Sequence, residues 1–352
     1  MLTLKQQVKQ MKSSISVVLA CALCCIVVSS CTPEEPLITS YDDQWRMLVS
    51  GPTGLYTVSM PQGTVQASIW KPASAEAPYP ITRIIEFRDQ LYALRNAAEI
   101  VVLDRDDLSV ANTISLGAPA GGIAFANATT AYVSLPDLHS VAIVDLTVMR
   151  EVGTIDVGFR TSDISAVGNQ ICVLLSQTAE AKIIDSRTNS VVATISLPSA
   201  SPFLVEGDGL SSVFCVVMKG SGKDSANAEP KTTPVLSSID VESKQITTSV
   251  LLTARESQGP DQIPRSLAIN SNGFCYVPVQ NGLLQVQSRA PRRAAAVQFD
   301  AYSGAWYDAA RARIICATAD GRTIDVFDEY AESKITTVTI PDSTNCIVGL
   351  AP

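Results

Sequence analysis

A recurring aspartate restricts the folds that are open to this chain of 352 residues. Each copy ends a β-rich run and is followed, at the ninth and tenth positions, by a small hydroxyl residue and a β-branched residue. The copies are Asp104, Asp145, Asp185, Asp240 and Asp328. Their intervals are 41, 40, 55 and 88 residues. We interpret these intervals as one repeat, one repeat, one repeat with an insertion of about 15 residues, and two repeats.

Each unit holds four short strand-like runs that are separated by turn residues. In the third unit the runs are residues 122–126, 131–135, 140–144 and 152–157. Four strands in about 40 residues are the signature of a β-propeller blade, and residues 44–352 suffice for seven blades of about 44 residues. The sequence therefore predicts an all-β fold, a seven-bladed β-propeller of four-stranded antiparallel blades.

The two ends of the repeat array predict how the ring closes. The first blade supplies only three runs, near residues 45–49, 55–60 and 65–70, whereas a spare run at 345–350 follows the last blade. We expect this C-terminal strand to pair with the N-terminal blade and to close the ring without a covalent link.

Three fragments of the repeat resemble the YVTN-type repeat of bacterial seven-bladed propellers. They are AYVS at 131–134, VAIVD at 141–145 and SVVATI at 190–195. The resemblance covers blades two to four well and blades five and seven adequately. In the first blade Ser59 replaces the aspartate, and in the sixth blade Gln287, Ser288 and Arg289 stand there instead. Such repeats mark an architecture, so the resemblance implies the fold and no particular chemistry.

The N-terminus has the pattern of a secretory signal. Lys5, Lys9 and Lys12 precede an apolar run at 15–28 that is too short for a permanent membrane span. The sequence VSSC at 28–31 resembles the lipobox of bacterial lipoproteins, which implies cleavage before Cys31 and lipidation of that residue. The alternative is an ordinary signal peptide. We expect a signal peptide over 1–30, a tether over 31–43 and the propeller over 44–352.

The tether indicates that the protein is located in the cell envelope. Glu34 and Glu35 follow Cys31 closely, and this acidic pair resembles the export signal of lipoproteins that reach the outer face of the outer membrane. We expect an outer-membrane lipoprotein that is exposed at the cell surface; the alternative is the periplasmic face. No second run of 18 or more apolar residues follows, so the lipid would be the anchor.

Composition excludes several classes of function. The net charge of −8 disfavours a phosphate backbone, so we expect no nucleic acid partner. His139 is the single histidine, so any Ser-His-Asp, Cys-His or multi-His zinc mechanism would have to converge on this one ring. The repeated aspartates are separated by a blade width, so we expect them to accept backbone N–H bonds in turns rather than to bind an ion. We therefore expect no catalysis, no cofactor and no metal.

Five cysteines remain in the propeller segment: Cys172, Cys215, Cys275, Cys316 and Cys346. The first four align at one position of the second strand in their blades, among apolar residues. Equivalent positions on neighbouring sheets lie about 10 Å apart, beyond the limit for a disulfide of about 7 Å between Cα atoms. We expect free, buried thiols.

The ligand is expected on the face of the propeller that carries the loops between second and third strands and between blades. Two long polar insertions, 219–234 and 253–264, fall on this face, where binding residues tend to lie on a rigid scaffold. Trp306 is expected near the axis. The candidate ligand-binding residues are Trp70, Tyr79, His139, Phe159, Arg160, Phe203, Lys219, Lys223, Arg255, Gln258, Asp261, Gln262, Arg265 and Trp306.

These features favour a binding protein that captures a small-molecule ligand or docks an envelope protein, without turnover. Lipid anchor and repeat together are similar to surface propeller lipoproteins that capture cobalamin for an outer-membrane transporter, so the resemblance implies a corrinoid such as vitamin B12 as a candidate ligand. Two alternatives stay open. One is a propeller enzyme, a lactonase or a quinone-dependent dehydrogenase; the other is a non-catalytic scaffold in an envelope complex.

Overall fold

The computed structural model describes residues 44–52, 54–66, 81–95, 97–199, 202–220, 232–252, 266–279, 282–287 and 294–350. The chain divides into two compact units, Met1–Asp43 and Gln44–Pro352, and the described residues all belong to the second. The expected signal peptide, tether and lipidated Cys31 therefore lie outside the described residues. Within the described ranges, no helix has the length and apolar character needed to cross a membrane.

The described residues form seven antiparallel sheets of four strands each, which we number as blades 1 to 7. Blade 2 contains β4 (Ile81–Phe87), β5 (Gln90–Arg95), β6 (Glu99–Asp104) and β7 (Val110–Ser115). Blade 3 contains β8 (Gly122–Asn127), β9 (Thr130–Leu135), β10 (Ser140–Asp145) and β11 (Arg150–Asp156), with a short 3-10 turn η1 (Pro136–Leu138) before β10. Blade 4 contains β12 (Thr161–Val167), β13 (Gln170–Leu175), β14 (Glu180–Asp185) and β15 (Ser190–Ser196).

The remaining blades repeat this order. Blade 5 contains β16 (Pro202–Gly207), β17 (Ser212–Gly220), β18 (Thr232–Asp240) and β19 (Gln245–Leu251). Blade 6 contains β20 (Ala268–Ile269), β21 (Phe274–Val279), β22 (Gly282–Gln287) and β23 (Ala295–Gln298). Blade 7 contains β24 (Tyr302–Asp308), β25 (Arg313–Thr318), β26 (Thr323–Phe327) and β27 (Lys334–Thr339). The predicted all-β, seven-bladed propeller of four-stranded antiparallel blades is confirmed.

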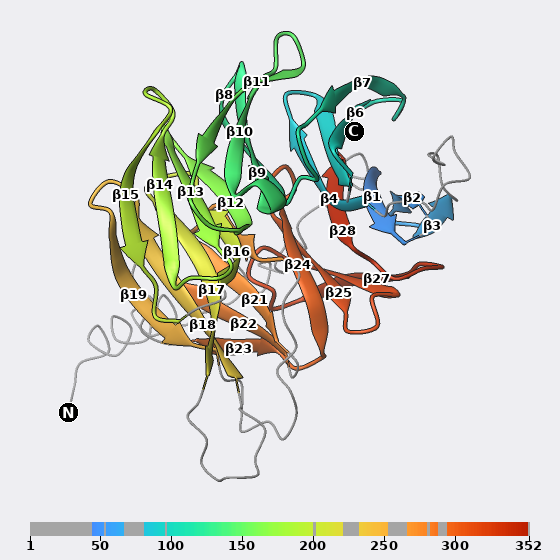
Figure 1. Cartoon of the computed structure of the whole chain (residues 1–352). Coiled ribbons are helices and arrows are strands. Elements are labelled where there is room, and N and C mark those ends of the chain that lie inside the picture. Colours follow the sequence, from blue (N-terminus) through green and yellow to red (C-terminus); the bar gives the residue numbers. More distant parts are fainter. Residues whose placement is uncertain are drawn as a thin grey trace, which may run out of the picture. The chain divides into compact units, whose positions relative to one another are not determined.

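Blade 1 is assembled from both ends of the described chain. Its strands are β28 (Cys346–Leu350), β1 (Trp45–Gly51), β2 (Gly54–Met60) and β3 (Thr64–Gln66). β28 pairs antiparallel with β1, from Arg46 opposite Leu350 to Ser50 opposite Cys346. Figure 1 shows this red C-terminal strand beside the blue N-terminal one. The predicted closure of the ring by a C-terminal strand is confirmed.

The core lies between the blades rather than within any one of them. Among the described residues, seven clusters of buried apolar side chains are present, and each spans one pair of neighbouring blades. The second strands β9, β13 and β21 are buried along almost their whole length because each is covered on both faces by other blades. The outermost strands β11, β15 and β19 alternate between exposed residues and residues that are half-buried or, at the sixth position, buried. The distance of a strand from the propeller axis thus determines its composition: second strands are apolar because they are covered on both faces, and outer strands are rich in hydroxyl residues because one face meets solvent.

The repeated aspartates cap the turns between third and fourth strands. Asp145 Oδ1 accepts hydrogen bonds from the backbone N–H and the hydroxyl of Thr147, at 2.8 and 2.6 Å. The carboxylate of Asp328 accepts three backbone N–H groups of the turn that follows it. Asp104, Asp185 and Asp240 each accept at least one backbone N–H in the same way. The predicted structural role of these aspartates is confirmed.

The five cysteines are free and buried, as expected, but the expected alignment of the first four at one strand position was wrong for Cys172. Gln170 and Ser212 both pair with the turn aspartate of their blade; Cys172 follows Gln170 by two residues, whereas Cys215 follows Ser212 by three. The two cysteines therefore point to opposite faces of their sheets, and both belong to the cluster between blades 4 and 5. The misalignment is therefore a difference of one residue in the register of the cysteine against the third strand.

Deletion of the last ten residues, 343–352, should abolish cooperative folding of the propeller. It removes β28, exposes the edge of β1 and takes Cys346, Ile347 and Leu350 out of two inter-blade clusters. Circular dichroism with thermal melting is the measurement, and a chain that lacks only residues 351–352 is the control. A sharp, near-native melting transition in the ten-residue deletion would show that β28 does not close the ring.

Candidate functional site

A cavity of about 870 Å³ lies on the axis of the propeller. The innermost strands of all seven blades, β28, β4, β8, β12, β16, β20 and β24, contribute to its wall. The lining includes residues at both ends of these strands, so the cavity runs along the axis. Its size lies in the range of about 300–1,000 Å³ that is usual for small-molecule sites. We call it the axial cavity.

Within the axial cavity an ion pair joins blade 2 to blade 4. Arg83 Nη1 of β4 lies 2.6 Å from Asp163 Oδ1 of β12. Both residues directly follow a β-bulge, between Ile81 and Arg83 in one strand and between Thr161 and Asp163 in the other. A bulge adds one residue and re-aims the side chains that follow it, and bulges are enriched beside functional sites. The bulges therefore help to bring the two charges together.

The intervening blade leaves room for the contact of Arg83 with Asp163, because it offers no side chain at this level. The residue there is Gly122 of β8, and a Cβ atom on it would lie 2.8 Å from Asp163 Oδ1 and 3.5 Å from Arg83 Nη1. At 2.8 Å one of the two atoms would have to shift, and Asp163 Oδ1 is held in place by Arg83 and the N–H of Ile164. Glycine here permits the close approach of a neighbouring chain, which is a common role of glycine inside a strand.

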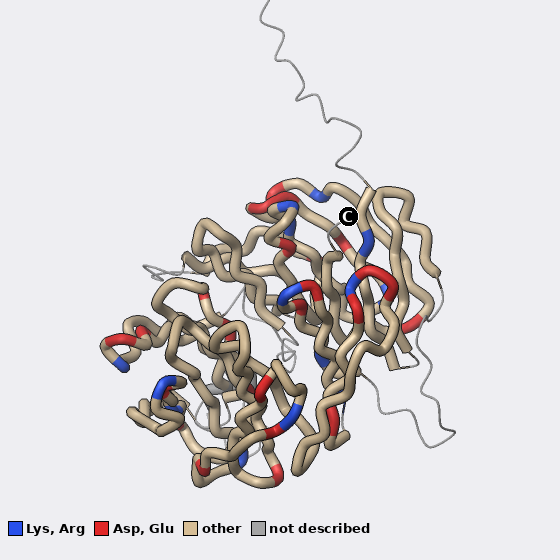
Figure 2. The backbone as a smooth tube through the Cα atoms, turned by 90° about the horizontal axis from the view of Figure 1, so that it is seen from above, with Lys and Arg blue, Asp and Glu red and all other residues tan. Residues whose placement is uncertain are grey.

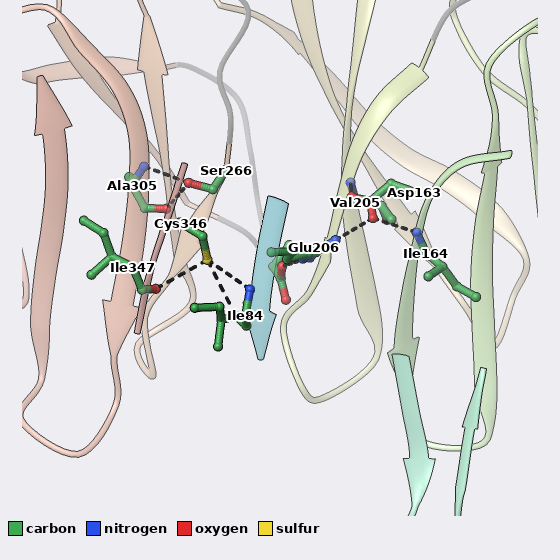
Figure 3. A network of polar contacts seen from close by, with 10 residues as sticks. Ile84, Asp163, Ile164, Val205, Glu206, Ser266, Ala305, Cys346 and Ile347 are labelled. Carbon is green, nitrogen blue, oxygen red and sulfur yellow. Dashed lines mark hydrogen bonds and ion pairs between the residues drawn. The ribbon is translucent and has the colours of Figure 1, made fainter. Parts of the chain in front are cut away.

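Asp163 is buried and its hydrogen-bonding capacity is largely used. Oδ1 accepts the backbone N–H of Ile164 at 2.9 Å in addition to Arg83, and Oδ2 accepts the backbone N–H of Val205 from β16 at 3.0 Å. Figure 3 shows Asp163 between these two backbone groups. The carboxylate thus ties β12 to β16 and fixes the guanidinium; the nearby Asp163 charge also raises the pKa of Arg83.

Glu206 of β16 adds a second carboxylate beside the same guanidinium. Its Oε2 lies 3.4 Å from Arg83 Nη2, a much looser contact than the one made by Asp163. Burial raises the pKa of Glu206 to about 7, and the Asp163 charge acts in the same direction, whereas Arg83 opposes the shift. The side chain is 39% exposed and lines the axial cavity. Glu206 is therefore a carboxyl group that titrates near neutral pH where a ligand could meet it.

Side chains on the other part of the wall fasten neighbouring inner strands to each other. Ser266, just before β20, donates to the carbonyl of Ala305 at 2.8 Å and accepts from its N–H at 3.0 Å. Cys346 Sγ accepts the N–H of Ile84 at 3.3 Å (Figure 3). Burial raises the pKa of the Cys346 thiol, so it stays protonated at neutral pH. These groups hold blade to blade around the cavity.

The end of the axial cavity near the turns between first and second strands carries balanced charges. Arg105 Nε lies 3.1 Å from Glu86 Oε1, and Arg311 Nη1 lies 2.9 Å from Asp308 Oδ2. Figure 2 shows the same pattern over the described backbone, where acidic and basic residues are interspersed.

In the described ranges, no group of three or more His, Cys, Asp or Glu side chains could hold a metal ion.

Four of the predicted ligand-binding residues can be placed with their side chains. Trp306 of β24 is half-buried and lines the axial cavity, close to the axis as expected. His139 lies exposed between η1 and β10, in the left-handed region with a φ of 53°. Phe159 and Arg160 lie exposed between β11 and β12, and Arg160 pairs with Asp137 of η1 at 3.3 Å. Arg160 therefore lies on one face with the turn that precedes His139, apart from Trp306 on the cavity wall.

The other predicted residues fall in strands or outside the described ranges. Phe203 lies in the backbone of β16. Lys219 was expected in the loop 219–234, which was wrong: it lies in β17, where Lys219 pairs with Thr233, because the ends of the insertion continue the hairpin ladder. The following candidates lie outside the described residues: Trp70, Tyr79, Lys223, Arg255, Gln258, Asp261, Gln262 and Arg265.

Sequence reasoning missed Arg83, Asp163 and Glu206. A signal was present, because each is a charge within the apolar first strand of a blade: Asp163 and Glu206 are single charges in TSDISAV and PFLVEG, and Arg83 shares ITRIIEF with Glu86. A charge in the most interior strand of a blade needs a partner, and the ring offers partners across the axis.

The comparisons with known proteins bear on the fold alone. No protein-family model matches the sequence, and no curated protein matches it. Solved structures do match. U3-55K has a TM-score of 0.60 and 10% identity, over 89% of this chain and 97% of that one. The Pan2 WD40 domain of Neurospora crassa has a TM-score of 0.57 and 11% identity, over 80% of this chain and 88% of that one. Hydrazine synthase of Kuenenia stuttgartiensis has a TM-score of 0.56 and 14% identity, over 76% and 80%. The chain shares the propeller architecture with these proteins.

Replacement of Asp163 by alanine should destabilise the propeller by about 3–5 kcal/mol, because it leaves Arg83 without its close partner and frees two backbone N–H groups inside the ring. The matched control is Asp137→Ala, whose ion pair with Arg160 is more than half exposed on both sides and is worth at most about 1 kcal/mol. Urea denaturation of both variants measures the difference. Equal losses of stability would contradict the structural role of Asp163.

Proposed function

We propose that this chain is a binding protein of the cell envelope that takes a small-molecule ligand into the axial cavity and does not turn it over. The observation that carries the proposal is a ligand-sized cavity with a charged group, Glu206, that is not fully used by the fold. The half-buried ring of Trp306 adds an aromatic surface to the same wall. A concave site with apolar walls and few polar groups is the usual form of a small-molecule site.

The proposed location in the cell envelope rests on the N-terminal sequence. Cys31 in the lipobox-like sequence would carry the lipid, and the acidic tether would place the propeller at the cell surface or, failing that, on the periplasmic side. A lipid-anchored binding protein suits delivery of its ligand to a neighbouring envelope protein such as an outer-membrane transporter. The corrinoid version of this function is supported only by the resemblance to cobalamin-capturing propeller lipoproteins.

Binding without turnover is favoured because the polar groups in the described part of the cavity wall are already engaged in hydrogen bonds or are protonated. Asp163 is held by three donors, and Ser266 is hydrogen-bonded in both directions to Ala305. The thiol of Cys346 is protonated and bonded to Ile84, so it is a poor nucleophile. Catalysis by acid and base would need a second available group beside Glu206.

A ligand that enters the axial cavity should raise the melting temperature and change the fluorescence of Trp306. Because binding to the folded state alone stabilises by about 2.7 kcal/mol at 100 times the Kd, the shift should be readily measured. The experiment screens the purified protein against small molecules that include cyanocobalamin, and Trp306→Phe is the control for the fluorescence signal. No shift with cyanocobalamin would dispose of the corrinoid version, and no shift with any compound would contradict the proposed function.

A further inference from the structure

The charges that line the axial cavity do not balance. Within the described part of the chain, the charged lining residues are Arg83, Glu86, Arg105, Asp163, Glu206 and Asp308. Five of them belong to an ion pair of 3.1 Å or shorter: Arg83 with Asp163, Glu86 with Arg105, and Asp308 with Arg311. Glu206 is the exception, since its shortest ion pair is the 3.4 Å contact with an arginine that Asp163 already holds.

The surplus carboxylate favours one sign of ligand charge. Arg83 and Asp163 together are neutral, so among the described lining residues the ionised form of Glu206 leaves one uncompensated negative charge. A partly desolvated charge without a close partner is unfavourable, and a cation that approaches it gains both a Coulomb attraction and a charge-assisted hydrogen bond. An anionic ligand would instead meet two carboxylates beside one arginine.

From this imbalance we propose that the axial cavity selects ligands that carry a protonated amine or amidine on an apolar body, with Glu206 as the group that receives the cation. This inference rests on the proposed function and adds the chemical class of the ligand. The apolar body would lie against the walls that Trp306 and the aliphatic residues of the inner strands supply. An indole face can also attract a cation through its quadrupole.

Binding of such a cation should depend on pH. Glu206 faces Arg83 of β4 and Asp163 of β12, and the buried thiol of Cys275 in β21 lies close enough to interact with it electrostatically. With the pKa of Glu206 at about 7, the carboxylate is ionised at pH 8 and mostly protonated at pH 5.5. An amine stays protonated at both values. If only the carboxylate binds the cation, the Kd should rise about thirtyfold from pH 8 to pH 5.5.

Three probes with one apolar body and different head groups test this inference: 4-phenylbutylamine, 4-phenylbutanol and 4-phenylbutyrate. Calorimetric titrations of the full-length protein at pH 8 and pH 5.5 should give the tightest binding for the amine at pH 8 and about thirtyfold weaker binding at pH 5.5. The alcohol should bind weakly, with no dependence on pH. In Glu206→Gln the amine should lose its advantage over the alcohol and its pH dependence. Glu242→Gln, which alters an exposed carboxylate outside the cavity, is the matched control.

The outcomes separate this inference from the proposed function. Cation selection would be overturned if the alcohol or the carboxylate bound more tightly than the amine, or if amine binding were unchanged in a folded Glu206→Gln variant. In either case, a fluorescence response of Trp306 to any probe would still support a ligand in the axial cavity. Absence of amine binding at millimolar concentration would overturn cation selection as well. Circular dichroism of Glu206→Gln establishes that the variant is folded.

Discussion

The ring is closed because the two ends of the propeller segment meet in one sheet: five residue pairs between β28 and β1 join the C-terminal strand to blade 1. The closure brings Cys346 beside Ile84 and Ile347 against blade 7, so that each blade has an apolar neighbour on both sides. It also completes the wall of the axial cavity, because β28 is one of the seven innermost strands. The cavity and its charges are therefore a consequence of the same strand pairing that holds the fold together.

The innermost strands of the closed ring have backbone N–H and C=O groups that face the axis and have no neighbouring strand to pair with. The inner edge of each blade is an unpaired strand edge, and buried backbone groups need partners. In this chain, side chains of one blade satisfy backbone groups of the next: Asp163 accepts from Val205, Ser266 bonds to Ala305, and Cys346 accepts from Ile84 (Figure 3). The first role of these polar residues on the axis is thus to bond neighbouring inner strands to each other. Glu206 differs from them, because linking inner strands does not explain its presence.

The repeat in the sequence carried most of the information about the fold, and much less about the site. Radial position fixes strand composition, so the period, the turn aspartates and the spare C-terminal run predicted the blades and the closure correctly. The contact of Arg83 with Asp163 depends on two bulges and on Gly122 in the blade between them, and no local pattern in the sequence reveals which blades meet across the axis. The same limit explains the cysteines, since the face that Cys172 or Cys215 occupies depends on its register against the third strand of its blade.

The energetics of the Arg83, Asp163 and Glu206 group argue for a ligand rather than for stability. A buried ion pair contributes little net stability, because desolvation offsets most of the attraction. Arg83 and Asp163 already form a neutral pair with further hydrogen bonds, so a second carboxylate beside them adds desolvation cost and repulsion from Asp163, which is visible in the raised pKa of Glu206. A fold that needed only to tie its inner strands would be served as well by glutamine at this position. Under the proposal of a cationic ligand, a glutamate here becomes favourable when the cation enters the cavity and supplies the charge that the described residues leave uncompensated.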